Sequence, residues 1–210
     1  MRFRLIARLC ASLAYLIVAA TVATAAADAP PADAAAKQIF AFHDALLDSM
    51  KQAKQLGVTG RYNKLKPVIE RTFDFNAMTS AAVGSNFATL PSSDQKALVE
   101  AFERMTIASY AHNFDGYSGE RFTMDPNVPA RGDHKLVQTT LVVPNDKPHA
   151  FNYVLHPVGG TWKVIDILLE GYVSQAATKR SDFSATIARG GAKALIARLN
   201  SISDGLLAGA

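Results

Sequence analysis

The sequence has almost no cysteine: Cys10 is the single one in 210 residues, so no disulfide can form within the chain. No run of basic residues is longer than Lys179-Arg180, which argues against a nucleic-acid-binding surface. Three catalytic signatures are also missing: a Ser-His-Asp order with an oxyanion loop, a glycine-rich phosphate cradle, and a carboxylate pair at catalytic spacing. Without a disulfide, the fold must be stabilised by packing. Without these signatures, the sequence does not indicate any of the corresponding enzyme classes.

The first 27 residues have the pattern of a secretory signal peptide. Arg2, Arg4 and Arg8 form a basic start, and the stretch 9–27 carries no charge and ends in small residues. Cleavage after Ala25 or Ala27 fits the small residues that a signal peptidase requires. An uncleaved membrane anchor is the alternative, because 19 uncharged residues nearly span a bilayer. Cys10 lies at the very start of this stretch, two residues after Arg8, so it does not indicate a lipoprotein.

Removing the signal peptide changes the charge of the protein. Three of the 22 basic residues leave and none of the 18 acidic ones, so the net charge falls from +4 to +1. The mature chain therefore offers no broad basic field for nucleic acid. We expect a signal peptide at 1–27, a flexible lead at 28–36, one domain at 37–203 and a C-terminal tail at 204–210. A single core is sufficient for a chain of about 180 residues.

Apolar residues at three- and four-residue steps predict helices before and after a central region. Pro67 should end or kink the second helix, and a Ser92 hydroxyl should cap the fourth while Gln95 reaches back. Gly190-Gly191 should break the last helical stretch in two. The predicted helices span 33–56, 62–72, 75–83, 93–114 and the region from 181 onward.

Between the helices the period changes to two, which indicates strands at 121–125, 135–143, 149–157 and 161–169. The short connections between the last three favour hairpins, so we predict a four-stranded antiparallel meander. The fold class is α+β: one domain with helices from both ends of the chain packed on one antiparallel sheet.

Strand alternation assigns the side chains of each strand to two faces, one of them more apolar. Grouping the apolar sets on a common face is a hypothesis that rests on polarity, since sequence does not give the register between strands. The alternative is that these residues simply bury against the helices as ordinary core. The apolar sets are Val137, Thr139, Leu141 and Val143; Phe151, Tyr153 and Leu155; and Ile165, Ile167 and Leu169.

Several segments together resemble a known family. The segments 162–166, 170–171, 180–183 and 191–199 are similar in order and spacing to the signature of the MlaC family, also called the toluene-tolerance family, of periplasmic phospholipid-binding proteins. The segment 73–78 followed by Gly84, and Tyr110 with 113–122, resemble its hopanoid-associated HpnM branch. The resemblance covers about residues 35 to 202.

The resemblance implies a periplasmic monomer that shuttles one lipid, a hopanoid or a phospholipid, between membrane-bound transport partners. It also implies an MlaC-like cone with an apolar cavity between sheet and helices, without cofactor. Such a cavity needs apolar volume and few polar anchors. On that basis the expected lining residues are Phe102, Met105, Leu141, Val143, Phe151, Tyr153, Ile165, Ile167, Leu169 and Tyr172.

The charged residues near the end of the last long strand have two interpretations. Asp166 and Glu170 can pair with Arg180 and hold this strand to the final helix. Alternatively, Arg180 or Lys179 contacts a lipid head group, which a neutral hopanoid would not require. Trp162 is interpreted as a packed anchor.

Two other interpretations concern chemistry. His43, Asp44 and Asp48 have helical spacing but lack a third suitable soft ligand, so we expect a solvated helix face and no metal. An enzyme alternative, an isomerase or dehydratase acting on an apolar substrate, would use Tyr153 as oxyanion donor and Asp166 as proton acceptor.

Overall fold

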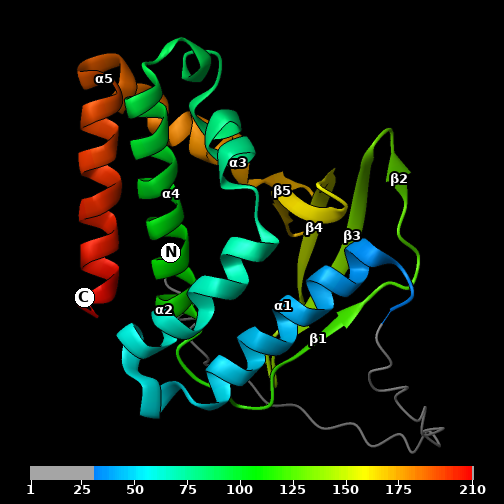
Figure 1. Ribbon diagram of the computed structural model, residues 1–210. Helices are drawn as coiled ribbons and strands as arrows, with labels where there is room; N and C mark the ends of the chain where they lie inside the picture. The colour runs from blue at the N-terminus through cyan, green and yellow to red at the C-terminus, as the bar shows by residue number, and fades with distance from the viewer. Residues whose placement is uncertain (1–30, 210) are drawn as a thin grey trace, which may run out of the picture.

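The computed structural model describes residues 31–209, so the predicted signal peptide and the first three residues of the predicted lead lie outside the described residues. The strands lie on one side of the molecule and helices α4 and α5 on the other, with α1 lying across the sheet (Figure 1). The α+β class is confirmed. No helix among residues 31–209 has the length and apolar character needed to cross a membrane.

The first two helices follow one another almost without a break. Helix α1 spans Ala34–Lys51 and begins at Asp33, whose side chain accepts hydrogen bonds from two backbone amides of the first turn. Helix α2 spans Ala53–Thr72 and kinks at Gly57, where φ is 60°. The prediction that Pro67 ends or kinks a helix was wrong, because α2 continues through it. Pro67 is exposed, so the carbonyl that loses its helical partner there remains accessible to water.

Helix α3 spans Phe75–Val83 as predicted, and a short 3₁₀ turn at Phe87–Thr89 leads to α4, Ser92–Asn113. The expected cap was wrong: Ser92 lies inside α4, and Pro91 occupies the capping position without a side-chain hydrogen bond. Gln95 does reach back, because its side-chain amide donates to the Leu90 carbonyl at 2.9 Å. The predicted buried stripe of α4 is confirmed at Leu98, Ala101, Phe102, Met105 and Ala108.

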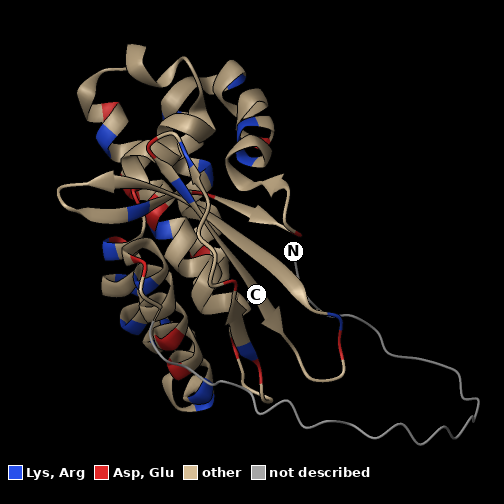
Figure 2. Cartoon of the chain, turned by 90° about the vertical axis from the view of Figure 1, so that its right-hand side faces the viewer, with Lys and Arg blue, Asp and Glu red and all other residues tan. Residues whose placement is uncertain are grey.

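Helix α5 spans Gln175–Leu207 and departs from helical geometry at Gly191, where φ is 63°. The predicted break between two helices is confirmed at Gly191, and the first of them starts earlier than residue 181. The part of α5 after Gly191 runs beside α4 (Figure 1), and Arg104 pairs with Asp204 across them at 2.6 Å. Charges of both signs are interspersed over the helices that Figure 2 shows.

The sheet has six antiparallel strands, so the prediction of four was wrong. The four predicted strands are all present and pair as a meander, while two-residue strands join its edges. Such short strands carry no periodicity that a sequence can show. The spatial order is β1-β3-β4-β5-β6, with β2 beside β3. The strands are β1 Arg121–Met124, β2 Ala130–Arg131, β3 His134–Val142, β4 His149–Val158, β5 Thr161–Leu169 and β6 Val173–Ser174.

An extra residue in β5 changes which side chains face the helices. Tyr153 of β4 pairs with Ile167, but Leu155 pairs with Val164, so Ile165 is the residue that the bulge inserts. Val164 is fully buried on the core side, whereas Ile165 is half-buried. The bulge thus brings Val164 to the core side, which a regular strand with Ile165, Ile167 and Leu169 on that face would not do.

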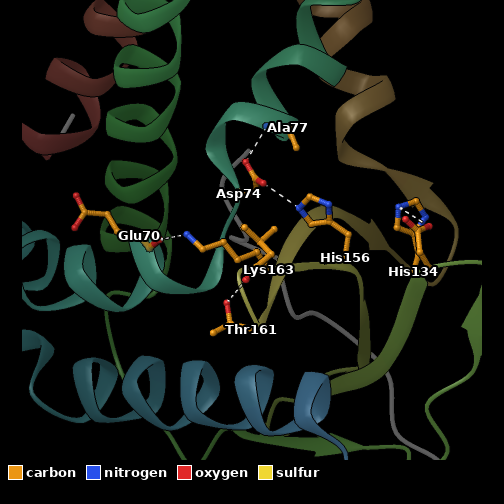
Figure 3. A network of polar contacts seen from close by, with 9 residues as sticks. Glu70, Asp74, Ala77, His134, His156, Thr161 and Lys163 are labelled. Atoms are coloured by element: carbon orange, nitrogen blue, oxygen red, sulfur yellow. Dashed lines mark hydrogen bonds and ion pairs between the residues drawn. The ribbon is translucent and has the colours of Figure 1, made fainter.

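One hydrophobic core joins the helices to the sheet and includes residues of α1 to α5 and of β3, β4 and β5. The segment between α2 and α3 lies directly against β5, where Phe73 forms a parallel bridge with Val164. The Lys163 ammonium donates to the carbonyl of Glu70 at 3.3 Å, which adds a second link between β5 and α2 (Figure 3).

Candidate functional site

Aromatic rings fill the space between the sheet and α4. The ring of Phe42 on α1 lies edge-on to Tyr153 of β4, at 6.3 Å between centroids, and edge-on to Tyr110 of α4, at 5.4 Å. Phe73 completes the group, 5.3 Å from Phe42 and 6.0 Å from Tyr110. Edge-to-face contacts are favourable because they place the positive edge of one ring against the negative face of the other. We call Phe42, Phe73, Tyr110 and Tyr153 the aromatic cluster.

A polar pair lies beside this cluster. His43 Nε2 is 3.1 Å from the Tyr153 hydroxyl, and the two side chains come from α1 and β4. His43 is 4 % exposed and Tyr153 1 %. The imidazole stacks on the ring of Phe122 from β1, with 3.8 Å between centroids. The pair is therefore enclosed by apolar and aromatic groups.

Burial sets the charge state of this pair. It lowers the pKa of His43 from 6.5 to about 3, so the imidazole is neutral at physiological pH. Burial, with a smaller contribution from Tyr110, raises the pKa of Tyr153 well above its usual value. The two side chains therefore provide a hydrogen-bond donor and a hydrogen-bond acceptor in an apolar interior, and neither is charged.

The structure brings together about half of the predicted lining residues. Leu141, Tyr153 and Ile167 are buried on the sheet face that meets the helices, and Phe102 and Met105 are buried on α4. Phe102 contacts Phe75 of α3 and Phe183 of α5, so it lies between helices. The half-buried members are Val143, Phe151, Ile165 and Leu169.

Tyr172 is separated from the other predicted residues. Its side chain is 80 % exposed, and it lies at a hollow of about 430 Å³ on the sheet face opposite the core. Leu136, Val154 and Leu168 also line this hollow, together with Arg131. The structure thus places Tyr172 on the outside of the sheet.

The predicted pairing of Asp166 and Glu170 with Arg180 was wrong. Asp166 accepts hydrogen bonds from the Ser174 hydroxyl at 2.6 Å and from the amide of Ala176 at 3.0 Å, and so holds the start of α5 to β5. Glu170 pairs with His149 at 3.0 Å. The Arg180 guanidinium donates to the carbonyl of Ala81 at 2.9 Å and lines a hollow of about 490 Å³ between α3 and α5.

Two chemical interpretations do not match the geometry. Tyr153 faces the core while Asp166, paired with Val154, points to the other face, so the proposed catalytic pair is not assembled. The expected solvated helix face is wrong for His43, which is buried in the core, whereas Asp48 pairs with Lys64 at 2.6 Å on the surface. Among residues 31–209, no group of three His, Cys, Asp or Glu side chains has an arrangement that could hold a metal.

Phe42 and His43 belong to the site but are not among the residues predicted to line it. The signal was present, because Ile39, Phe42 and Leu46 form a buried stripe on α1 and His43 is adjacent to it. A histidine next to an apolar helix face is a candidate for burial, but its partner Tyr153 is 110 residues away in the sequence. Only the fold identifies that partner.

Comparisons with known proteins give a consistent result. The protein-family model described as "MlaC protein" matches residues 41–201 of this chain. Seven chains of solved structures match, among them a phospholipid-binding protein from Ralstonia solanacearum in complex with a phospholipid. It has a TM-score of 0.71 and 23% sequence identity, and the match covers 83% of this chain and 99% of that chain, so the two share a fold. No curated protein matches the chain.

Proposed function

Because this chain belongs to the MlaC protein family, we propose that it is a periplasmic carrier that binds one lipid between its sheet and its helices. The lipid is a hopanoid or a phospholipid, and the carrier exchanges it with membrane-bound transport partners. The predicted signal peptide supports export, and the phospholipid bound by the Ralstonia protein of the same fold supports a lipid cargo.

The energetics of lipid transfer favour a carrier of this kind. Each methylene group exposed to water costs about 0.8 kcal/mol, so an unaccompanied lipid faces a large barrier in an aqueous compartment. An apolar protein interior removes most of this cost. The donor membrane is equally apolar, so the carrier needs only a comparable environment and can release its cargo again.

The composition of the core supports a lipid site between sheet and helices. The buried side chains there include aromatic rings and the flexible thioethers of Met50, Met78 and Met105. Methionine side chains adapt to irregular shapes, and aromatic rings can rotate to new packing positions. In our proposal, the lipid inserts between the rings of the aromatic cluster, and contacts between the rings are replaced by contacts between the rings and the lipid.

The single observation that carries the proposal is the family match over residues 41–201. To test it, the mature protein is purified without detergent from the cells that naturally produce it, so that any lipid bound in the cell stays bound. Native mass spectrometry should show up to one lipid per chain, and organic extraction should identify it as phospholipid or pentacyclic triterpenoid. Protein that is uniformly empty, and that also takes up no lipid from vesicles, would refute the carrier.

A matched pair of variants on β3 locates the site. Leu141 is buried on the core face of β3, whereas Leu136 lies on the opposite face at the outer hollow. Leu141→Gln should lower the fraction of protein that holds lipid, while Leu136→Gln should leave it near the wild-type value. Thermal unfolding of both variants verifies that they remain folded. Equal lipid retention in both would place the cargo elsewhere.

A further inference from the structure

The phenol hydroxyl of Tyr153 can form one more hydrogen bond than the one that it shares with His43. The two side chains share one hydrogen bond, 3.1 Å long. If the tyrosine donates it, the phenol oxygen can accept another bond; if the imidazole donates it, the phenol hydroxyl can donate one. A hydroxyl group on a ligand can serve either arrangement, because it both donates and accepts.

The charge state of the surroundings restricts the class of ligand. A phosphate or carboxylate moved beside this pair would lose its hydration without gaining an opposite charge, which is unfavourable in an apolar interior. An uncharged hydroxyl loses much less on transfer and recovers a hydrogen bond from Tyr153. The pair thus favours the neutral polar end of a lipid over a charged head group.

A second buried polar group lies on the same helix. Ser49 is fully buried on the α1 stripe that includes Phe42 and Leu46, and its hydroxyl has no hydrogen-bond partner within the part of the chain that the structure describes. Buried hydroxyls without a partner are uncommon in folded proteins. Ser49 follows His43 by six residues, about 9 Å along the helix axis. Together these groups place hydrogen-bonding capacity at two points on the buried surface of α1.

We propose that the part of the lipid that enters the core carries an uncharged hydroxyl, which hydrogen bonds to Tyr153 while His43 positions the phenol. This inference rests on the proposed lipid carrier and specifies the class of its cargo: a neutral hydroxyl-bearing lipid, such as a polycyclic alcohol. Tyr153 is the contact residue and His43 is a positioning residue.

The test compares two lipids that differ by one hydroxyl. Delipidated mature protein is incubated with equimolar cyclodextrin complexes of cholestanol and cholestane, and the bound lipids are quantified after native gel filtration and extraction. The wild type should retain cholestanol over cholestane by about five-fold, which corresponds to one net hydrogen bond of about 1 kcal/mol. Tyr153→Phe should bring this ratio close to one while still retaining cholestane.

Further variants distinguish hydrogen bonding from general disturbance of the core. Tyr110→Phe makes the same change in the aromatic cluster without touching the His43 contact, so it should keep the wild-type ratio. His43→Leu should lower the ratio, and His43→Gln should restore most of it because an amide can still hydrogen bond to the phenol. An unchanged ratio in Tyr153→Phe would overturn the inference.

The possible outcomes separate this inference from the carrier proposal. Wild-type protein that retains cholestanol and cholestane equally is a lipid carrier without a hydroxyl site, which refutes the inference alone. Wild-type protein that retains neither compound but takes up phospholipid also refutes it. Protein that takes up no lipid of any kind refutes the proposed function and the inference together.

Discussion

His156 on β4 and Asp74 at the start of α3 form a contact of 2.9 Å between Nε2 and Oδ2, although 82 residues separate them in sequence (Figure 3). The other oxygen of the same carboxylate accepts the backbone amide of Ala77, also at 2.9 Å, and so caps α3. One side chain therefore starts a helix and attaches it to the sheet.

We expect Asp74→Ala to destabilise the protein by about 1 to 2 kcal/mol, because the substitution removes both a helix cap and the contact with His156. The measurement is urea-induced unfolding followed by circular dichroism. Asp133→Ala is the control: Asp133 is exposed and caps no helix, so its removal should change stability by less than about 0.5 kcal/mol. Equal unfolding midpoints for the two variants would contradict the role of Asp74.

His43 should make stability depend on pH. Its pKa is about 3 in the folded protein, where burial lowers it, and near 6.5 in the unfolded chain. The unfolded state therefore binds more protons below pH 6.5, so the stabilisation present above that pH is lost progressively as the pH falls toward 3.

The matched control for this effect is His43→Gln, which keeps a hydrogen-bonding group beside Tyr153 and does not titrate. Between pH 7 and pH 5 the wild type should lose about 2 kcal/mol more unfolding free energy than this variant. Carboxylate titration below pH 5 affects both proteins alike. Parallel stability curves for the two proteins would show that His43 is not buried as described.

Two glycines of α5 should respond to alanine in opposite ways. At Gly191 and at Gly205 an added Cβ would meet no atom within 4 Å, but Gly191 has φ of 63° whereas Gly205 is in the ordinary helical region. Gly191→Ala should destabilise by about 1 kcal/mol through backbone strain, and Gly205→Ala should stabilise by up to about 1 kcal/mol. Thermal unfolding measures both, and equal shifts of the same sign would argue against the kink at Gly191.

Tyr172 should not affect lipid retention. Its side chain is 80 % exposed on the sheet face away from the core. We expect Tyr172→Ser to hold as much co-purifying lipid as the wild type, by native mass spectrometry, whereas Leu141→Gln holds less. Loss of lipid in Tyr172→Ser would move the binding site to the outer hollow.

The α+β architecture could be predicted because the hydrophobic period of the chain changes where the elements change. The apolar stripe of α4 and the alternation in β3 and β4 depend on side chains within one element, so the sequence carries them directly. Similarly, Gly190-Gly191 was expected to break the last helical stretch, and the chain leaves helical geometry at Gly191 with a positive φ, which glycine tolerates.

Other features could not be predicted because they depend on register or on distant partners. The bulge at Ile165 shifts part of β5 by one position, and alternation alone cannot show such a shift. Asp166 was expected to pair with a cation, yet backbone amides and Ser174 at the start of α5 satisfy it. Carboxylates accept either kind of donor, and sequence does not distinguish between them.

The ammonium of Lys135 lies 4.6 Å from the centre of the Trp162 ring and pairs with Asp33, the residue that starts α1. Lys135 follows Asp33 by 102 residues, so this anchor of the first helix is synthesised long after the helix itself. Early in synthesis α1 can wind and pack on α2, but its contacts with β3 and β5 form only when those strands are present. The buried stripe of α1 therefore reaches its full packing late, as contacts between distant parts of a sequence generally do.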